Sequence, residues 1–157
     1  MSYKLRTEIG AGNRREISLR APADDASFRQ TEKALQEVLQ NRQGMALTRG
    51  GAEYFLPLGE LLFFETSEGK TAAHTAREMF YTDKRLHELE EILPYNFIRV
   101  SKSCILNASR ISSIARNITG ASAVYFFGTD KKTYVSRSLF KQLRERIDLI
   151  RTEGRGK

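Results

Sequence analysis

Two short segments of this sequence place a long cationic side chain between two serines. The segment 101–103 reads Ser-Lys-Ser, and the segment 136–138 reads Ser-Arg-Ser. Ammonium and guanidinium groups bind phosphate oxygens, an arginine fork also fits O6 and N7 of guanine, and serine hydroxyls donate to either kind of acceptor. The second segment also precedes a helical pattern, and the free N–H groups at a helix start favour phosphate. Both segments therefore predict contacts with a nucleic acid.

The segment around Lys102 has two interpretations. Residues 97–107, FIRVSKSCILN, alternate between apolar and polar side chains as in a half-buried strand, yet Lys102 falls on the apolar side. In a continuous strand its stem would pack and its ammonium would reach water. Alternatively, the strand breaks at 101–103 and a loop carries the lysine outward. The residue pattern leaves both interpretations open.

The composition limits the class of protein. The chain has 157 residues, of which 40% are hydrophobic, enough for one domain with a short appendage. It has neither an apolar run of about 18 residues nor an apolar leader, and its single cysteine fits a reducing compartment. We therefore expect a cytoplasmic protein. One cysteine and two histidines make a poor set for a zinc site, so no metal or cofactor is expected.

Charge is distributed unevenly along the chain. The formal net charge is +7, but residues 52–96 hold 4 basic and 9 acidic side chains, whereas residues 97–151 hold 11 basic and 3 acidic ones. The basic part would attract phosphates, anionic lipid or an acidic protein. A merely solvated basic face is the alternative that charge alone leaves open.

Residues 1–43 are predicted to form a small N-terminal unit with a dimerising or regulatory role. YKLRTEI and REISLRA read as two short strands around a GAGN turn, which predicts a β-hairpin. A helix is expected to follow from Asp24 or Asp25 as its N-cap. Its apolar side is a narrow stripe made of Phe28, Thr31, Leu35, Val38 and Leu39. This helix needs a partner surface, either the rest of the chain or a second copy.

From residue 44 onward the sequence predicts many short strands separated by turn residues. The expected strands are 45–49, 53–58, 61–66, 70–75, 78–82, 97–100, 103–107, 111–116, 122–127 and 132–136. A short helix is expected at LHELEEIL, and a last helix near Ser136 or Ser138. Residues 151–157 are expected to be a disordered tail. The predicted fold class is mainly β.

Three motifs resemble the LytTR DNA-binding domain of bacterial response regulators. LLFFETSEGKTAAHT matches the family's first strand motif, RLHELEEILPYNFIRVSKSCILNASRISSI matches its helix and the segment after it, and KKTYVSRSLFKQLRERI contains the late Val-Ser-Arg before a helix. The motifs occur in family order and cover residues 44–150. The resemblance implies an elongated stack of small antiparallel sheets with one or two short helices, here preceded by the N-terminal hairpin and helix.

The resemblance also implies a function, the sequence-specific binding of double-stranded DNA by a transcription regulator. Family members read successive major grooves with loops between strands, and three such loops match here: at Lys102, at Arg137, and at the turn after FFET, nearest to Lys70 or its neighbours Glu68 and Gly69. The candidate DNA-binding residues are Lys70, Arg99, Ser101, Lys102, Ser103, Ser136, Arg137 and Ser138. Further candidates for phosphate contacts are Arg110, Arg116, Lys131 and Lys132.

The same resemblance suggests partners. Family members usually recognise two repeated half-sites, so we expect a homodimer on DNA, with the helix after Asp25 as the candidate contact. About 43 residues precede the domain. They are too few for a receiver domain, so no phosphorylation input is expected in this chain. Short family members resemble regulators held in check by a membrane-protein partner. No small-molecule substrate is expected.

An RNA- or single-strand-binding module is the alternative function. Such a module would stack bases on aromatic side chains. Five phenylalanines could do so, but they have the spacing of core residues: Phe63, Phe64, Phe97, Phe126 and Phe127. Arg137 also has a structural alternative, an ion pair with Glu145 or another acid.

An enzyme is not expected, because the sequence pairs no nucleophile with a base. Cys104 falls on the apolar side of its segment and is predicted to be buried. His74 reads as a strand residue and His87 as a surface residue. Asn107 ends a strand and is predicted to be a turn residue that bonds its own backbone. No catalytic residue is therefore assigned.

Overall fold

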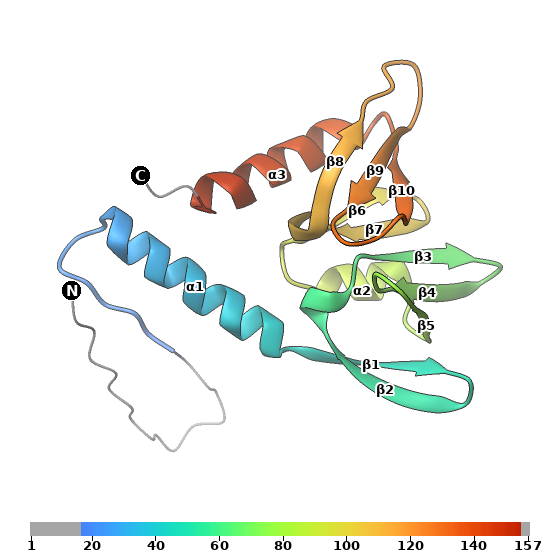
Figure 1. Cartoon of the computed structure of the whole chain (residues 1–157), viewed down its shortest axis with the longest axis horizontal. Helices are drawn as coiled ribbons and strands as arrows, with labels where there is room; N and C mark the ends of the chain where they lie inside the picture. The colour runs from blue at the N-terminus through green and yellow to red at the C-terminus, as the bar shows by residue number, and fades with distance from the viewer. Residues whose placement is uncertain (1–16, 155–157) are drawn as a thin grey trace.

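The structure is a computed structural model that describes residues 17–154, and two antiparallel sheets make up most of it (Figure 1). The strands are β1 (Gly44–Arg49), β2 (Ala52–Pro57), β3 (Phe63–Ser67), β4 (Lys70–His74), β5 (Met79–Thr82), β6 (Phe97–Ser101), β7 (Cys104–Asn107), β8 (Ile111–Ala115), β9 (Ser122–Phe126) and β10 (Lys132–Val135). The helices are α1 (Ala26–Arg42), α2 (Leu86–Ile92) and α3 (Phe140–Gly154), with 3₁₀ turns η1 (Leu58–Glu60) and η2 (Ala108–Arg110). Each strand expected from residue 44 onward is present, and the mainly β fold class is confirmed.

The sheets differ in size and share one core. The larger sheet has the strand order β2-β1-β5-β4-β3-β7-β6, and the smaller one has the order β10-β9-β8. The first core lies between β3, β6 and β7 of the larger sheet, the smaller sheet, and α3, and Val100, Val124 and Leu143 are fully buried in it. This core fixes the smaller sheet and α3 against one end of the larger sheet.

A second core fills the opposite face of the larger sheet. Leu47, Phe64 and Phe80 from the sheet pack there with Leu89 from α2. Phe63 belongs to the first core and its neighbour Phe64 to the second. Consecutive residues of β3 are therefore apolar because both faces of this strand are covered.

Helix α1 extends away from the sheets, on the side opposite the β3–β4 turn (Figure 1). Its N-cap is Asp25, as expected, because the backbone N–H of Phe28 donates to Asp25 Oδ1 at 2.9 Å. The helix contacts α3 and η1. Val38 and Leu39 near its C-terminal end remain 51% and 40% exposed. The narrow stripe predicted for this helix is thus only partly covered within the chain.

Helix α3 differs at both ends from the expectation. It begins at Phe140 and not at Ser136 or Ser138, because the N–H of Leu139 donates to the carbonyl of Ser136 in a turn that precedes the helix. It continues to Gly154, so the expected disordered tail from residue 151 is wrong for 151–154, and 155–157 lie outside the described residues. Between residues 17 and 154, no helix is both long and apolar enough to cross a membrane.

The predicted N-terminal hairpin lies mostly outside the described residues. Of its second strand only 17–21 are described, and they have no regular secondary structure. The hairpin and a dimerising or regulatory role for 1–43 therefore stay predictions.

Candidate nucleic-acid interface

Lys102 lies in a tight turn between two strands. Strand β6 ends at Ser101, β7 begins at Cys104, and the pairing register shifts between Arg99 and Ser101. The side chain of Lys102 is exposed. Of the two interpretations open from the sequence, the broken strand with an outward lysine is confirmed. Lys102 falls on the apolar side of the sequence pattern because the turn and the register shift interrupt the alternation of apolar and polar side chains.

Arg99 anchors this turn from within the protein. Its Nε donates to the carbonyl of Ser101 at 3.1 Å, and its Nη2 donates to the carbonyl of Lys102. Its Nη1 lies 3.6 Å from a carboxylate oxygen of Glu90. Three guanidinium nitrogens thus face protein acceptors, whereas the sequence made Arg99 a candidate DNA contact. Arg99 thus holds the backbone of the Lys102 turn, and its contact with DNA stays a prediction.

The β3–β4 turn lies beside the Lys102 turn. The N–H of Thr66, in β3 just before this turn, donates to the carbonyl of Ser103 in the Lys102 turn at 2.8 Å. Glu68 and Gly69 at the tip have positive φ angles of 52° and 76°, the backbone of a type I′ turn. Lys70 follows as the exposed first residue of β4.

The loop between β10 and α3 joins the same region. The N–H of Ser136 donates to the carbonyl of Val100 at 2.7 Å, next to the Lys102 turn. The hydroxyls of Ser136 and Ser138 lie 3.4 Å apart. Arg137 is exposed, and no ion pair joins it to Glu145 or to another described acid. Arg137 therefore remains available to a ligand.

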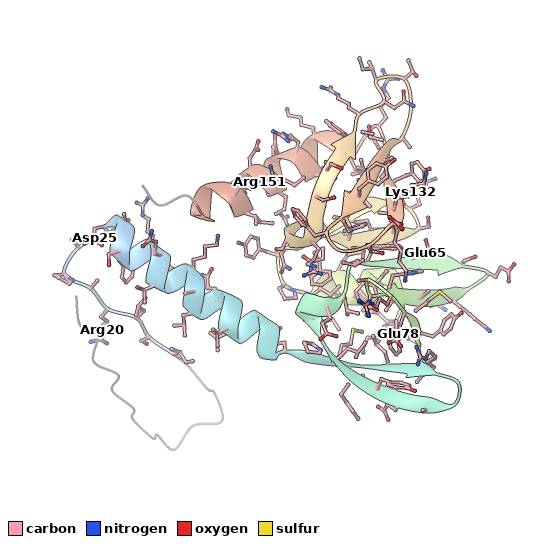
Figure 2. The ribbon with its side chains drawn as sticks, in the orientation of Figure 1. Arg20, Asp25, Glu65, Glu78, Lys132 and Arg151 are labelled. Atoms are coloured by element: carbon pink, nitrogen blue, oxygen red, sulfur yellow. The ribbon has the colours of Figure 1, made fainter. Side chains whose placement is uncertain are left out.

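A groove of about 400 Å³ opens beside these loops, between β3, the β6–β7 turn and β10, and we call it the loop groove. Lys102 and Arg137 are not among its lining residues. Its lining includes Glu65, Thr66, Ser101, Ser103, Tyr134 and Ser136. Glu65 and Lys132 both lie on the side of the molecule away from α1 (Figure 2). The structure thus brings together loops that lie more than thirty residues apart in the sequence, from Ser67 to Lys102 and from Lys102 to Arg137.

Several cations proposed as phosphate contacts are engaged elsewhere. The guanidinium of Arg116 lies 4.8 Å from the ring centre of Phe140. Lys131 Nζ donates to the carbonyl of Glu78 at 2.8 Å. Arg110 is half-buried, and Lys132 stays exposed on β10. Only a tertiary structure separates these roles, because the partners lie far away in sequence.

The aromatic side chains are mostly core residues, as expected. Phe63, Phe64, Phe97 and Phe126 are buried, whereas Phe127 is 58% exposed. The core assignment is therefore confirmed for four of the five and wrong for Phe127. The four buried rings offer no surface on which a base could stack.

Cys104 is buried, as predicted, and lies 3.3 Å from the hydroxyl of Thr133. Burial raises the pKa of its thiol to about 12, so it stays protonated near neutral pH and is a poor nucleophile. His87 is exposed, as expected. Asn107 Oδ1 accepts from the N–H of Ser109 at 3.1 Å, which confirms the turn role, and it also accepts from the Asn96 side chain at 2.8 Å.

His74 belongs to a polar cluster that the sequence did not reveal. Its ring stacks on Phe63 at 4.3 Å between centres. Its Nε2 lies 3.1 Å from Glu65 Oε1, and its Nδ1 lies 3.4 Å from Lys131 Nζ. Burial is the largest cause that lowers the pKa of His74, which keeps the ring neutral near pH 7. The cluster joins β3 and β4 to the β9–β10 loop.

The sequence and the fold of this chain both match known proteins. The sequence model of the LytTr DNA-binding domain matches residues 52–148. The chain belongs to the LytTR family. The LytTr DNA-binding domain of a Bacillus cereus protein, described as a methyl-accepting/DNA response regulator, superposes with a TM-score of 0.62 at 20% identity. The match covers 68% of this chain and 97% of that domain, and it shows that the two share a fold.

Two similar proteins come from Staphylococcus aureus strains MRSA252 and NCTC 8325, and both are described as uncharacterized HTH-type transcriptional regulators. Each is 30% identical to this chain over 96 residues, which are 61% of this chain and 65% of the relative. The chain thus spans a little under two thirds of these relatives. In this LytTR domain, strands separate α1, α2 and α3, so residues 17–154 contain no helix-turn-helix pair.

Proposed function

We propose that this LytTR protein is a transcription regulator that binds double-stranded DNA sequence-specifically with its loops. The observation that carries the proposal is that backbone hydrogen bonds hold the Lys102 turn beside β3 and beside the start of the Arg137 loop, next to one groove. Lys102 and Arg137 are exposed and can reach a duplex from adjacent loops. Arg137 can bind O6 and N7 of guanine, and Lys102 can bind a phosphate or a guanine edge.

The charge distribution supports the same proposal. The segment 97–151 carries both cationic loops and has 11 basic against 3 acidic residues. Neutralised phosphates release counterions, so affinity should fall with salt with a log–log slope near −0.9 for each phosphate contact on B-DNA. Four of the five phenylalanines that could stack bases are buried, which disfavours the alternative of an RNA- or single-strand-binding module.

The proposal extends to how copies assemble and how they are controlled. Two copies bind two repeated half-sites in the cytoplasm, and the exposed Val38 and Leu39 of α1 supply a contact between them. Control by a membrane-protein partner is supported only by the family resemblance. Sedimentation of the full chain against Val38→Asp tests the dimer contact: the variant should be monomeric at concentrations where the wild type is not.

The deciding experiment is selection of bound duplexes from a random pool. A regulator that reads sequence should enrich one motif, and the motif should occur twice at a fixed spacing if two copies bind. The selected duplex, its single strands and a duplex RNA of the same sequence are then compared at matched salt. Equal or tighter binding of the single strand or the RNA would contradict loop-reading of duplex DNA.

A further inference from the structure

The loop groove combines hydroxyls with one carboxylate. The hydroxyls of Thr66, Ser101 and Ser103 belong to its lining, and hydroxyls either donate or accept. Glu65 contributes an acceptor, and its side chain is 45% exposed. None of the described residues that line the groove is cationic. An ionised carboxylate only accepts hydrogen bonds, so the groove fits a ligand that donates them.

The Glu65 carboxylate is held in place from behind. Neutral His74 has one N–H, and Lys131 can only donate, so His74 Nδ1 accepts from Lys131 and His74 Nε2–H donates to Glu65 Oε1. Lys131 is itself fixed by its bond to the carbonyl of Glu78. The carboxylate of Glu78 faces Arg49 at 3.0 Å. One carboxylate oxygen of Glu65 is thus bound inside the protein, and the other is left for a ligand.

The base edges of the major groove offer one kind of donor. Cytosine N4 and adenine N6 carry exocyclic amino groups, whereas guanine and thymine present acceptors at O6 and O4. Glu65 pairs with Cys104 of β7 on one side and with Ala72 of β4 on the other. It therefore lies between the strand that follows the Lys102 turn and the strand that begins at Lys70. A carboxylate at this position can recognise a hydrogen-bond donor on a base. Lysine and arginine cannot do so, because they recognise only acceptors.

We propose that Glu65 is a specificity-determining residue whose free carboxylate oxygen accepts a hydrogen bond from the exocyclic amino group of a cytosine or an adenine. His74 and Lys131 are the positioning residues that orient it. The inference rests on the proposed function, because it requires that the loop groove faces the bases of duplex DNA.

The experiment is random-pool selection with the full-length wild type, Glu65→Gln and Glu65→Ala. The wild type should enrich cytosine or adenine at one position and discriminate against the other bases by at least about 10-fold, as a hydrogen bond to a charged acceptor does. Glu65→Ala should lose that one preference and keep the others. In Glu65→Gln, His74 holds the amide oxygen, so the amide N–H₂ faces the groove and the preference should switch to guanine or thymine.

Glu53→Gln is the matched control. Glu53 is an exposed acid of β2 and is not part of the groove lining. Removing either acid should raise affinity for unrelated duplexes, because less negative charge opposes phosphate. Only the Glu65 variants should change a base preference. Thermal unfolding shows whether each variant is folded. If Glu65→Ala does not fold, Glu65→Gln still tests the inference, because its amide oxygen can accept the hydrogen bond from His74.

Two outcomes overturn the inference, and they are distinguishable. If both Glu65 variants bind all duplexes more tightly with every base preference intact, Glu65 is only a repulsive element, and the proposed function stands. If the wild type enriches no motif, sequence-specific binding fails, and the role of Glu65 in base recognition fails with it.

Discussion

The β6–β7 turn and the β3–β4 turn lie side by side, yet they are held by different means. A side chain outside the turn, Arg99, anchors Lys102 through two backbone carbonyls. The β3–β4 turn takes its shape from the positive φ angles of its own tip residues, Glu68 and Gly69. We infer that the first turn presents its cation in a fixed position and that the second presents Lys70 less strictly. We therefore expect the contact of Lys102 with DNA to be more defined than that of Lys70.

The largest expected effect is at Arg137, in the β10–α3 loop that lies next to the Lys102 turn. Arg137→Ala should weaken binding to a selected site by about 1–3 kcal/mol and relax specificity at one base pair, because a bidentate guanine contact is lost. Titration of the cognate duplex and of single-base variants measures both effects. A loss that is equal for every duplex would make Arg137 a phosphate clamp and would leave specificity to the turns.

Arg99→Gln tests the anchor itself. Removing hydrogen bonds from a charged donor should weaken binding by about 1–2 kcal/mol, because Lys102 is released. If Arg99 acts through Lys102, its effect should largely vanish in a Lys102→Ala background, as a double-mutant cycle measures. Additive losses would show that Arg99 contacts DNA independently. Glu90→Gln is the control: its partly exposed ion pair should contribute less than about 0.5 kcal/mol.

Gly69→Ala tests the turn that is set by its backbone. Gly69 has a φ of 76°, and a Cβ there would meet open space, so the effect is backbone strain alone. We expect a loss of about 1 kcal/mol in unfolding free energy, measured by denaturant titration. Gly44→Ala is the matched change at negative φ, where the new Cβ would lie 3.7 Å from the carbonyl of Leu56. Equal losses for both variants would remove the positive φ as the explanation.

The smallest expected effect compares the two lysines by salt dependence. Lys102→Ala should reduce the slope of log affinity against log salt by about one unit. Lys70→Ala should reduce it less, because Glu68 at the same tip already opposes a phosphate. Binding measured over a range of salt concentrations decides the matter. Equal reductions of the slope in the two variants would contradict the inference that Lys102 is held in a more fixed position than Lys70.

Features that depend on close neighbours in the chain could be predicted. Four such features involve residues within four positions of one another. They are the Asp25 cap, the Glu68-Gly69 turn, the apolar spacing along α2 and the hydrogen bond between Asn107 and the backbone of Ser109. Local sterics and hydrogen bonding fix such features whatever surrounds them. The start of α3 was misplaced because Ser136 and Ser138 resemble caps, whereas the turn at Leu139 delays the helix.

Features that depend on distant partners could not be predicted. Lys131 meets His74 across 57 positions and the Glu78 carbonyl across 53. Arg116 meets Phe140 from another element. In sequence these cations look the same as Lys102 and Arg137. Glu65 read as an ordinary strand residue because its bond to His74 crosses between β3 and β4, and the groove it lines is made by segments far apart in the sequence.

The sequence by itself determined the strands, the short helix and the LytTR family, because alternation, turn residues and motifs are written in local order. The tertiary structure alone decided which cations stay free, that segments far apart in the sequence line one groove, and that a carboxylate is held between them. The physical reason is that a charged side chain is available to a ligand only if no distant partner already binds it, and such partners are brought together only by the packing of the two sheets.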